Sequence, residues 1–221
     1  MERSEICERY WDIKLEKVKK ALERNNFTVF IASNAEAAGA LIMQKIVPQI
    51  EGLKSAAFGD SMTLRATGVL EAMTQLDGVE FIDPFPKGAP REEKVALRRR
   101  ALLTDLFFTG SNALTEDGKL VNLDMDGNRI GGIAYGPRNV ILTISRNKIV
   151  PDVERAMARI KEVAAPLNAI RHDYMKTPCQ KTGECMDCRS PDRICNQWLI
   201  TEKCYPAGRI RVVLINEEAG L

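Results

Sequence analysis

Residues 27 to 64 read FTVFIASNAEAAGALIMQKIVPQIEGLKSAAFGDSMTL, and this stretch decides the fold. It opens with FTVFIA, a compact run of aromatic and β-branched residues that predicts a strand. Ser33 and Asn34 are good helix N-caps, and the AEAAGALIMQKIV that follows predicts a helix ending before Pro48. Ser55 to Phe58 then predicts a second strand. Because strand–helix–strand units join parallel strands, the stretch predicts a parallel sheet.

The same alternation continues along most of the chain. Further strands are expected at 79–82, 106–109, 140–145 and 210–215, and further helices at 64–76, 91–103 and 151–164. Two Asp-Gly pairs bracket the run KLVNLDM, which predicts a hairpin. After the last of these helices we expect at most one short helix, near Asn196 to Ile200. The chain is therefore predicted to be α/β, with a mostly parallel sheet flanked by helices.

Composition limits the kinds of protein this can be. The chain has 221 residues, 45% apolar and 28% charged, which suits one α/β domain with or without a small appendage. A formal net charge of +2 gives no reason to expect a nucleic-acid partner. The N-terminal residues lack the apolar core of a signal peptide, and no window reaches the ~18 apolar residues of a membrane span. We therefore expect a cytoplasmic protein with reduced thiols.

The N-terminal segment differs from the rest. Residues 4 to 25 carry apolar side chains at roughly helical spacing among charges, which predicts a helix. We interpret residues 1–25 as an arm that packs on the body of the protein or on a second copy in a homodimer. Residues 26–221 would form the α/β domain, which includes an irregular cysteine-rich loop at 177–204.

A loop that could bind an anion follows the second strand. Gly59-Asp60-Ser61-Met62-Thr63 lies between a strand and a helix, where ligands gather in open α/β sheets. Gly59 permits a tight turn, while Ser61 and Thr63 add hydroxyl groups to the N–H groups of the next helix. A phosphate or a substrate carboxylate is the expected ligand. The alternative is an ordinary helix start, with Asp60 or Ser61 as its N-cap.

The end of another strand should lie in the same crevice as the Gly59 to Thr63 loop, at the carboxyl ends of the parallel strands. The strand at 106–109 runs into Gly110-Ser111-Asn112, and farther on Arg129 is the most suitable cation for a carboxylate or phosphate, because guanidinium binds such groups in a fork. The two Asp-Gly pairs are interpreted as turns rather than as ligands. His172 is the single histidine and has no nucleophile marked beside it. A hydrolase triad is therefore disfavoured, and no catalytic residue is assigned.

Four of the six cysteines lie in TPCQKTGECMDCRSPDRIC, residues 177 to 195, with the spacing Cys179-x5-Cys185-x2-Cys188-x6-Cys195. Four thiolates suit an iron–sulfur cluster or a structural zinc ion. Zinc ribbons usually carry two Cys-x2-Cys pairs and this segment has one, so the spacing favours a cluster, most simply 4Fe-4S, over zinc. Reduced thiols without a metal are the remaining alternative.

The surroundings of these thiols fit a ligated site. Lys181, Arg189 and Arg193 would offset the negative charge of metal-bound thiolates. Cys204 lies nine residues after the last of the four and is an alternative ligand, whereas Cys7 is remote in the sequence.

Three segments resemble the LUD-domain proteins, also called the lactate-utilisation family: FGDSMTL (58–64), TGSNALTEDGKLVNLDMDGNRIGGIAYGPRNVILTISRNKIV (109–150) and TPCQKTGECMDCRSPDRIC (177–195). The resemblance runs from about Phe27 to the end of the chain. It implies a fold related to sugar-phosphate isomerases and coenzyme A transferases (NagB/RpiA/CoA transferase-like). It also implies a role in lactate oxidation beside iron–sulfur oxidoreductase subunits. The positions that match the family's recurrent motifs are Gly59 to Thr63, Ser111-Asn112, Asn128-Arg129 and Asn147-Lys148.

Three functions follow as hypotheses. The first is an accessory or electron-transfer iron–sulfur subunit in oxidation of lactate or a related 2-hydroxy acid. Larger relatives carry tandem ferredoxin-type cysteine runs that are missing here, so at most one cluster fits and partners would complete any electron path. The second is a stand-alone isomerase-like or coenzyme A transferase-like enzyme, with Asp60 or Glu116 as acid or base. The third is a non-catalytic binding module with structural zinc.

Overall fold

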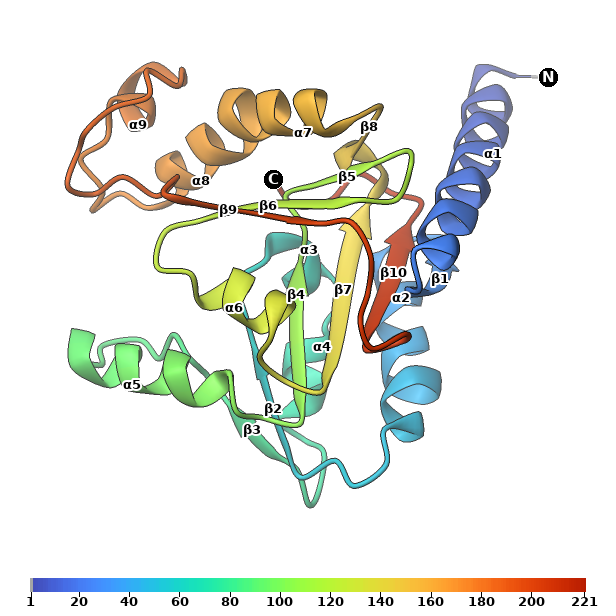
Figure 1. The fold of residues 1–221 in the computed structure, drawn as a ribbon, viewed down its shortest axis with the longest axis horizontal. Coiled ribbons are helices and arrows are strands. Elements are labelled where there is room, and N and C mark those ends of the chain that lie inside the picture. The colour runs from blue at the N-terminus through green and yellow to red at the C-terminus, as the bar shows by residue number, and fades with distance from the viewer. Residues whose placement is uncertain (1) are drawn as a thin grey trace.

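A six-stranded sheet forms the centre of the computed structural model, which describes residues 2–221 (Figure 1). All neighbouring strands in it are parallel, in the order β1-β10-β7-β4-β2-β3. The strands are β1 (Thr28–Ala32), β2 (Ser55–Phe58), β3 (Glu80–Ile82), β4 (Leu106–Gly110), β7 (Asn139–Ser145) and β10 (Ile210–Ile215). The predicted α/β class and mostly parallel sheet are confirmed.

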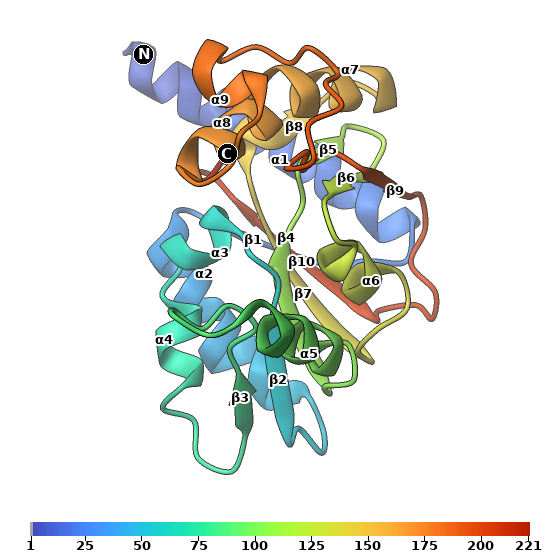
Figure 2. The ribbon, with the colours of Figure 1, turned by 90° about the vertical axis from the view of Figure 1, so that its left-hand side faces the viewer.

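Helices cover both faces of this sheet, so its strands are apolar on both sides. One face carries α2 (Ala35–Leu41) with its π-helical and 3-10 continuations η1 (Ile42–Ile46) and η2 (Val47–Gln49), together with α3 (Met62–Ala66) and α4 (Val69–Met73). The other carries α1 (Arg3–Arg24), α5 (Arg91–Ala101) and α6 (Asn128–Ala134). Figure 2 shows the two groups of helices on either side of the strands.

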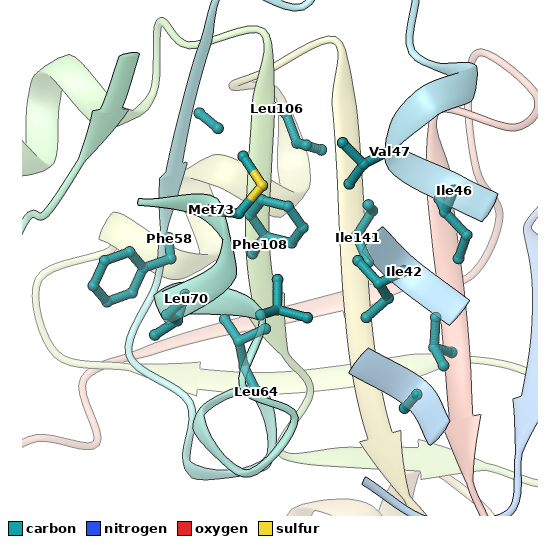
Figure 3. Packing of buried hydrophobic residues seen from close by; sticks show 14 of the residues in the cluster. Ile42, Ile46, Val47, Phe58, Leu64, Leu70, Met73, Leu106, Phe108 and Ile141 are labelled. Carbon is teal, nitrogen blue, oxygen red and sulfur yellow. The ribbon is translucent and has the colours of Figure 1, made fainter. Parts of the chain in front are cut away.

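Successive residues of a strand serve opposite faces. In β7, Ile141 packs into the core beneath α2, η1, α3 and α4, whereas Val140 and Leu142 pack into the core beneath α1. Figure 3 shows the first of these cores, where Phe108 of β4 lies among side chains of the helices. Leu64 is one of them and is completely buried.

One helix predicted as continuous is split in two. Residues 64–76 were expected to form a single helix, but α3 ends at Ala66 and α4 begins at Val69. Gly68 lies between them with φ of +70°, a left-handed conformation that a glycine adopts without steric cost. The loop after β2 therefore leads into only one turn of helix, whose dipole is correspondingly small.

A second, smaller sheet lies beside the first. Its order is β8-β5-β6-β9, formed by β5 (Ala113–Thr115), β6 (Leu120–Asp124), β8 (Ile149–Val150) and β9 (Gln197–Thr201). The predicted hairpin is confirmed for β5 and β6, which are antiparallel and turn at Asp117-Gly118. The second Asp-Gly pair leads into α6 instead of a strand. The short helix predicted near Asn196 to Ile200 is wrong, because this aromatic and β-branched segment pairs with β6 as β9.

The helix predicted at 151–164 is longer in the structure. It consists of α7 (Val153–Arg159), the π-helical η4 (Ile160–Ala164) and α8 (Ala165–Arg171) in direct succession. The cysteine segment follows and contains one short helix, α9 (Pro178–Thr182). Within residues 2–221, no helix has both the length and the apolarity needed to cross a membrane.

The predicted N-terminal helix forms as α1, and residue 1 of the proposed arm lies outside the described residues. The second half of α1 is part of the core, since Leu15, Val18 and Leu22 are fully buried. The first half projects from the body and exposes Ile6 and Ile13 (Figure 1).

Candidate functional site

A cavity of about 890 Å³ lies where several strands end. Its wall includes residues that directly follow β2, β4 and β6, together with residues of η4 and α8. Ligands of open α/β sheets collect at the carboxyl ends of parallel strands, so this is the expected place for a binding site. In Figure 2 the helices α8 and α9 lie above this end of the sheet and α3 lies below them.

Most of the crevice residues expected from the sequence meet in this cavity. Eight of them are in its wall, namely Asp60, Ser61, Gly110, Ser111, Asn112, Asn128, Arg129 and Lys148. The other three, Gly59, Thr63 and Asn147, are not in the wall but adjoin residues that are. Segments far apart in the sequence thus form one continuous surface, and a binding role for these residues stays a prediction.

Only a glycine fits at position 59, because the side chains of Arg129 and Thr109 pass very close to its backbone. A Cβ atom at this position would lie 2.7 Å from Cγ of Arg129 and 2.9 Å from Oγ1 of Thr109. Real Cβ atoms do not approach other atoms so closely, so Gly59 lets the stem of Arg129 cross the end of β2. The glycine therefore serves the placement of Arg129 in the cavity.

Ser61 has a structural role in this geometry. Its Oγ accepts a hydrogen bond from the Leu64 N–H at 3.2 Å and so caps α3, as the alternative interpretation expected. Thr63 is fully buried, and its hydroxyl connects two other parts of the site. It donates to the carbonyl oxygen of Ala219 at 3.2 Å and accepts from Nζ of Lys148 at 2.7 Å.

Lys148 is the most unusual charged residue of the site. Its side chain is 4% exposed, and no ion pair involves it within residues 2–221. Burial, together with the nearby guanidinium groups of Arg159 and Arg129, lowers the pKa of Lys148 to about 7. The amine therefore changes charge near neutral pH.

Two arginines are fixed beside this lysine. Arg129 donates from Nη2 to the Asn112 side-chain oxygen at 3.1 Å and to the Leu123 carbonyl at 2.7 Å. Arg159 donates to the carbonyls of Asn112 at 2.8 Å and Asn147 at 3.1 Å. The sequence predicted Arg129 as a binding residue but not Arg159, because in the sequence Arg159 is simply one of several charged positions on a predicted helix.

The cavity wall is rich in cations. It contains seven Lys or Arg side chains and four Asp side chains, namely Arg65, Lys87, Lys94, Arg98, Arg129, Lys148, Arg171, Asp60, Asp124, Asp126 and Asp173. The four carboxylates compensate only part of this charge. The cavity is therefore suited to an anionic ligand. Most of these cations come from helices and loops whose charges look like ordinary solvated faces in the sequence.

Asp60 is held as an anion. Burial by itself would raise the pKa of Asp60, but hydrogen bonding and charge from Arg171, with a further contribution from Arg65, hold that pKa below its usual value. A carboxylate paired in this way is a poor proton donor at neutral pH. Glu116, the other candidate acid or base, lies outside the cavity wall and pairs with Lys14 and Lys17 of α1.

His172 lines the cavity rather than the outer surface. Burial and the charge of Arg171 lower the pKa of His172, so its ring is neutral at physiological pH. Its Nε2 lies 3.0 Å from Nη2 of Arg171.

The segment after β10 closes one side of the site. The carbonyl of Ala219 accepts hydrogen bonds from Thr63 and from Ser145, and Leu221 is in the cavity wall. A Cβ atom on Gly220 would lie 2.8 Å from the Thr63 nitrogen, so this segment packs directly against the start of α3.

The four clustered cysteines border a second, much smaller hollow of about 20 Å³. Its other wall residues are largely apolar, including Pro166, Met186 and Ile194. All six cysteines are free, and within residues 2–221 no three His, Cys, Asp or Glu side chains form a group arranged to hold a metal ion. The four thiols thus share a hollow without the arrangement of ligands around one ion, and the predicted metal centre stays a prediction.

Cations also gather at this hollow. Arg193 donates to the carbonyls of Cys188 at 2.6 Å and Cys195 at 3.1 Å, and Lys161 of η4 pairs with Asp187 at 3.1 Å. Arg193 was expected beside the thiols, whereas Lys161 comes from a distant part of the sequence. Cys204 is elsewhere, buried in the core beneath α1, and Cys7 is exposed on that helix.

Comparison with known proteins supports the fold. No curated protein matches the chain. The crystal structure of a DUF162 family protein from Deinococcus radiodurans is similar, with a TM-score of 0.50 and 15% sequence identity over 93% of this chain and 98% of that one. At this identity the likeness shows a shared fold alone. A family model described as the LUD domain matches residues 15–215, and this protein therefore belongs to the LUD domain family.

Proposed function

We propose that this protein is an accessory iron–sulfur subunit in the oxidation of lactate or a related 2-hydroxy acid. In this proposal the large cavity binds the carboxylate of the metabolite, and Cys179, Cys185, Cys188 and Cys195 hold one cluster. The observation that carries the proposal is that Cys195 borders both the cysteine hollow and the cavity. A redox centre and an anion site that share Ala165, Ile194 and Cys195 in their walls would be suitably placed to act together.

The four thiols share one hollow, and their spacing in the sequence is what favours a cluster over a single zinc ion. Zinc needs four ligands at about 2.3 Å from one point, whereas the corners of a cluster accept thiolates that are farther apart. All four thiols share one hollow, yet no three of them are arranged around a single ion. Apolar walls and the nearby Arg193 and Lys161 would moderate the charge of such a centre.

A cluster would supply one-electron transfer at this place. Oxidation of a 2-hydroxy acid to a 2-oxo acid releases two electrons and two protons, so one such centre does not complete the reaction. The proposal therefore includes iron–sulfur oxidoreductase subunits as partners. The residues of the chain itself would bind and orient the metabolite: Arg129 provides positive charge, and Arg159 holds the backbone carbonyls of Asn112 and Asn147 beside it.

A stand-alone isomerase-like or transferase-like enzyme has less support. The two carboxylates considered as acid or base are both occupied, Asp60 by Arg171 and Arg65, and Glu116 by lysines of α1 outside the cavity.

Purification without oxygen tests the proposal. We expect a brown protein with iron and acid-labile sulfide, whose visible absorption bleaches on reduction, and calorimetry should detect lactate. Cys185→Ser should lose the iron, whereas Cys7→Ser, on exposed α1, should keep it. Protein that stays colourless after reconstitution with iron and sulfide, or that holds zinc instead, would contradict the electron-transfer role.

A further inference from the structure

The Lys148 amine is a buried group without a counter-ion in the cavity wall. Its single hydrogen bond within residues 2–221 goes to the neutral hydroxyl of Thr63, at 2.7 Å. Buried lysines are ordinarily paired with carboxylates, because an isolated ammonium ion is costly to bury. No such partner exists here in the described part of the chain, so a structural ion pair does not account for this lysine.

The surroundings favour the uncharged amine. Burial is the largest effect, and the guanidinium groups of Arg159 and Arg129 add repulsion. A desolvated lysine beside other cations is the usual form of a nucleophilic amine, since only the neutral form carries a free electron pair. A lysine meant only to attract anions would keep its charge. The environment of Lys148 instead matches a group that forms a bond to carbon.

We propose that the amine of Lys148 forms an imine with the carbonyl carbon of a small 2-oxo acid held in the cavity. The nitrogen bonds to the carbonyl carbon, and the carbonyl oxygen leaves as water together with the two protons of the neutral amine. No oxidant or reductant is consumed. The choice of a 2-oxo acid rests on the proposed function, because oxidation of a 2-hydroxy acid yields one.

The carboxylate of such a ligand has a partner beside the lysine. Arg129 uses Nη2 for Asn112 and Leu123, and its Nε lies 3.7 Å from Asp124. Its Nη1 makes no hydrogen bond within residues 2–221 and belongs to a residue of the cavity wall. An Nη1–carboxylate contact would hold the acid while its adjacent carbonyl carbon faces the amine. The Thr63 hydroxyl is hydrogen-bonded to Nζ and is therefore placed to transfer a proton from the nitrogen to the departing oxygen during loss of water.

Reductive trapping tests the inference. The whole protein is incubated with pyruvate and sodium borohydride, which reduces an imine to a stable amine, and is then analysed by intact mass and peptide mapping. We expect one adduct per chain, on the peptide that contains Lys148. Excess lactate should lower its yield, because lactate competes for the cavity but has a hydroxyl group in place of the keto group that reacts with the amine.

Two variants complete the design. Lys148→Arg keeps a cation but forms no imine and should lose the adduct, whereas Lys45→Arg, at an exposed lysine of η1, should keep it. Peptide mapping of the protein without substitutions shows whether the adduct is on Lys148, even if the Lys148→Arg variant folds poorly. An adduct that is missing, or spread over exposed lysines, overturns the inference.

The trapping experiment also separates this inference from the proposed function. If calorimetry shows that pyruvate and lactate bind but no adduct forms, only the inference fails. If neither acid binds, the ligand half of the proposed function fails with it. An undiminished adduct in the Cys185→Ser variant would show that the imine forms without any metal centre.

Discussion

Nζ of Lys148 donates a hydrogen bond to Oγ1 of Thr63 at 2.7 Å, which joins the residues after β7 to the first turn of α3. This contact satisfies one donor of the amine and leaves its charge uncompensated. Charge at this point costs stability, and its cost depends on pH.

Replacing Lys148 with Met should stabilise the protein at pH 6. The pKa of Lys148 is about 7 in the folded protein against 10.5 for the free side chain. Between these values the unfolded chain binds a proton that the folded protein lacks, so the stability contributed by this group rises with pH and is lowest below pH 7. Urea denaturation of Lys148→Met should show a gain of about 1–3 kcal/mol at pH 6 that shrinks by pH 9. Lys45→Met should leave the pH dependence unchanged, and a loss of stability at every pH would contradict the assignment.

Gly59→Ala should weaken anion binding by about tenfold or more, equivalent to about 1.4 kcal/mol. The added Cβ would lie 2.7 Å from Cγ of Arg129 and must displace that side chain. Calorimetric titration with lactate measures the effect. Gly131→Ala is the matched control, because its Cβ meets only Leu102 at ordinary distances of 3.5 and 3.6 Å. Equal affinities of the two variants would show that Arg129 does not hold the ligand.

Asp60→Asn should destabilise the protein by about 1–3 kcal/mol at pH 7, because it removes a partner of Arg171 and Arg65. Those contacts outweigh burial and hold the pKa of Asp60 below the ordinary value of 3.8 for an aspartate side chain. The stability that the carboxylate provides is therefore present above pH 4 and is lost as the pH falls through the folded pKa. Denaturation curves at pH 7 and pH 3 should show the difference shrink. Asp77→Asn, at an exposed site, should have no effect at either pH.

Arg193→Gln should loosen the cysteine loop. The guanidinium group holds the carbonyls of Cys188 and Cys195 and the carboxylate of Asp187, so its removal frees the backbone on both sides of the hollow. Metal-free protein should then react several-fold faster with iodoacetamide at the four loop cysteines, as followed by mass spectrometry. Arg189→Gln changes a neighbouring exposed arginine and should leave the rates unaltered.

Leu15→Ala should cost about 2–5 kcal/mol, since the leucine is completely buried. Ile13→Ala should cost almost nothing, because that side chain is 63% exposed. Thermal unfolding compares the two. Equal effects would mean that α1 is a loosely attached arm, contrary to its packing beneath β7 and β10.

The sequence predicted the parallel sheet well because its strands are compact apolar runs separated by helices. The run at 140–145 became β7, and the run at 210–215 became β10 with the same bounds. The sequence-based prediction was wrong where the secondary structure of a segment depends on a neighbouring strand with which it can pair. The segment after Cys195 has no period of its own, and it became a strand because the edge of β6 was there to pair with it.

The candidate site was predicted in part for a similar reason. Residues at strand ends, such as Asp60 and Asn112, can be expected to meet because parallel strands end at one edge of the sheet. Arg159 and Arg171 lie on the helix that crosses above this edge, and a helical position alone does not show which cavity it faces. The unusual state of Lys148 could not be foreseen, since it depends on burial and on charges brought from other elements.

The contact between the Ala219 carbonyl and Thr63 has a practical consequence for protein engineering. Leu221 is already in the cavity wall, so an affinity tag or fluorescent fusion attached there would begin at the proposed binding site and crowd it. The N-terminal end of α1 projects away from the body at the upper right of Figure 1 and is the better point of attachment.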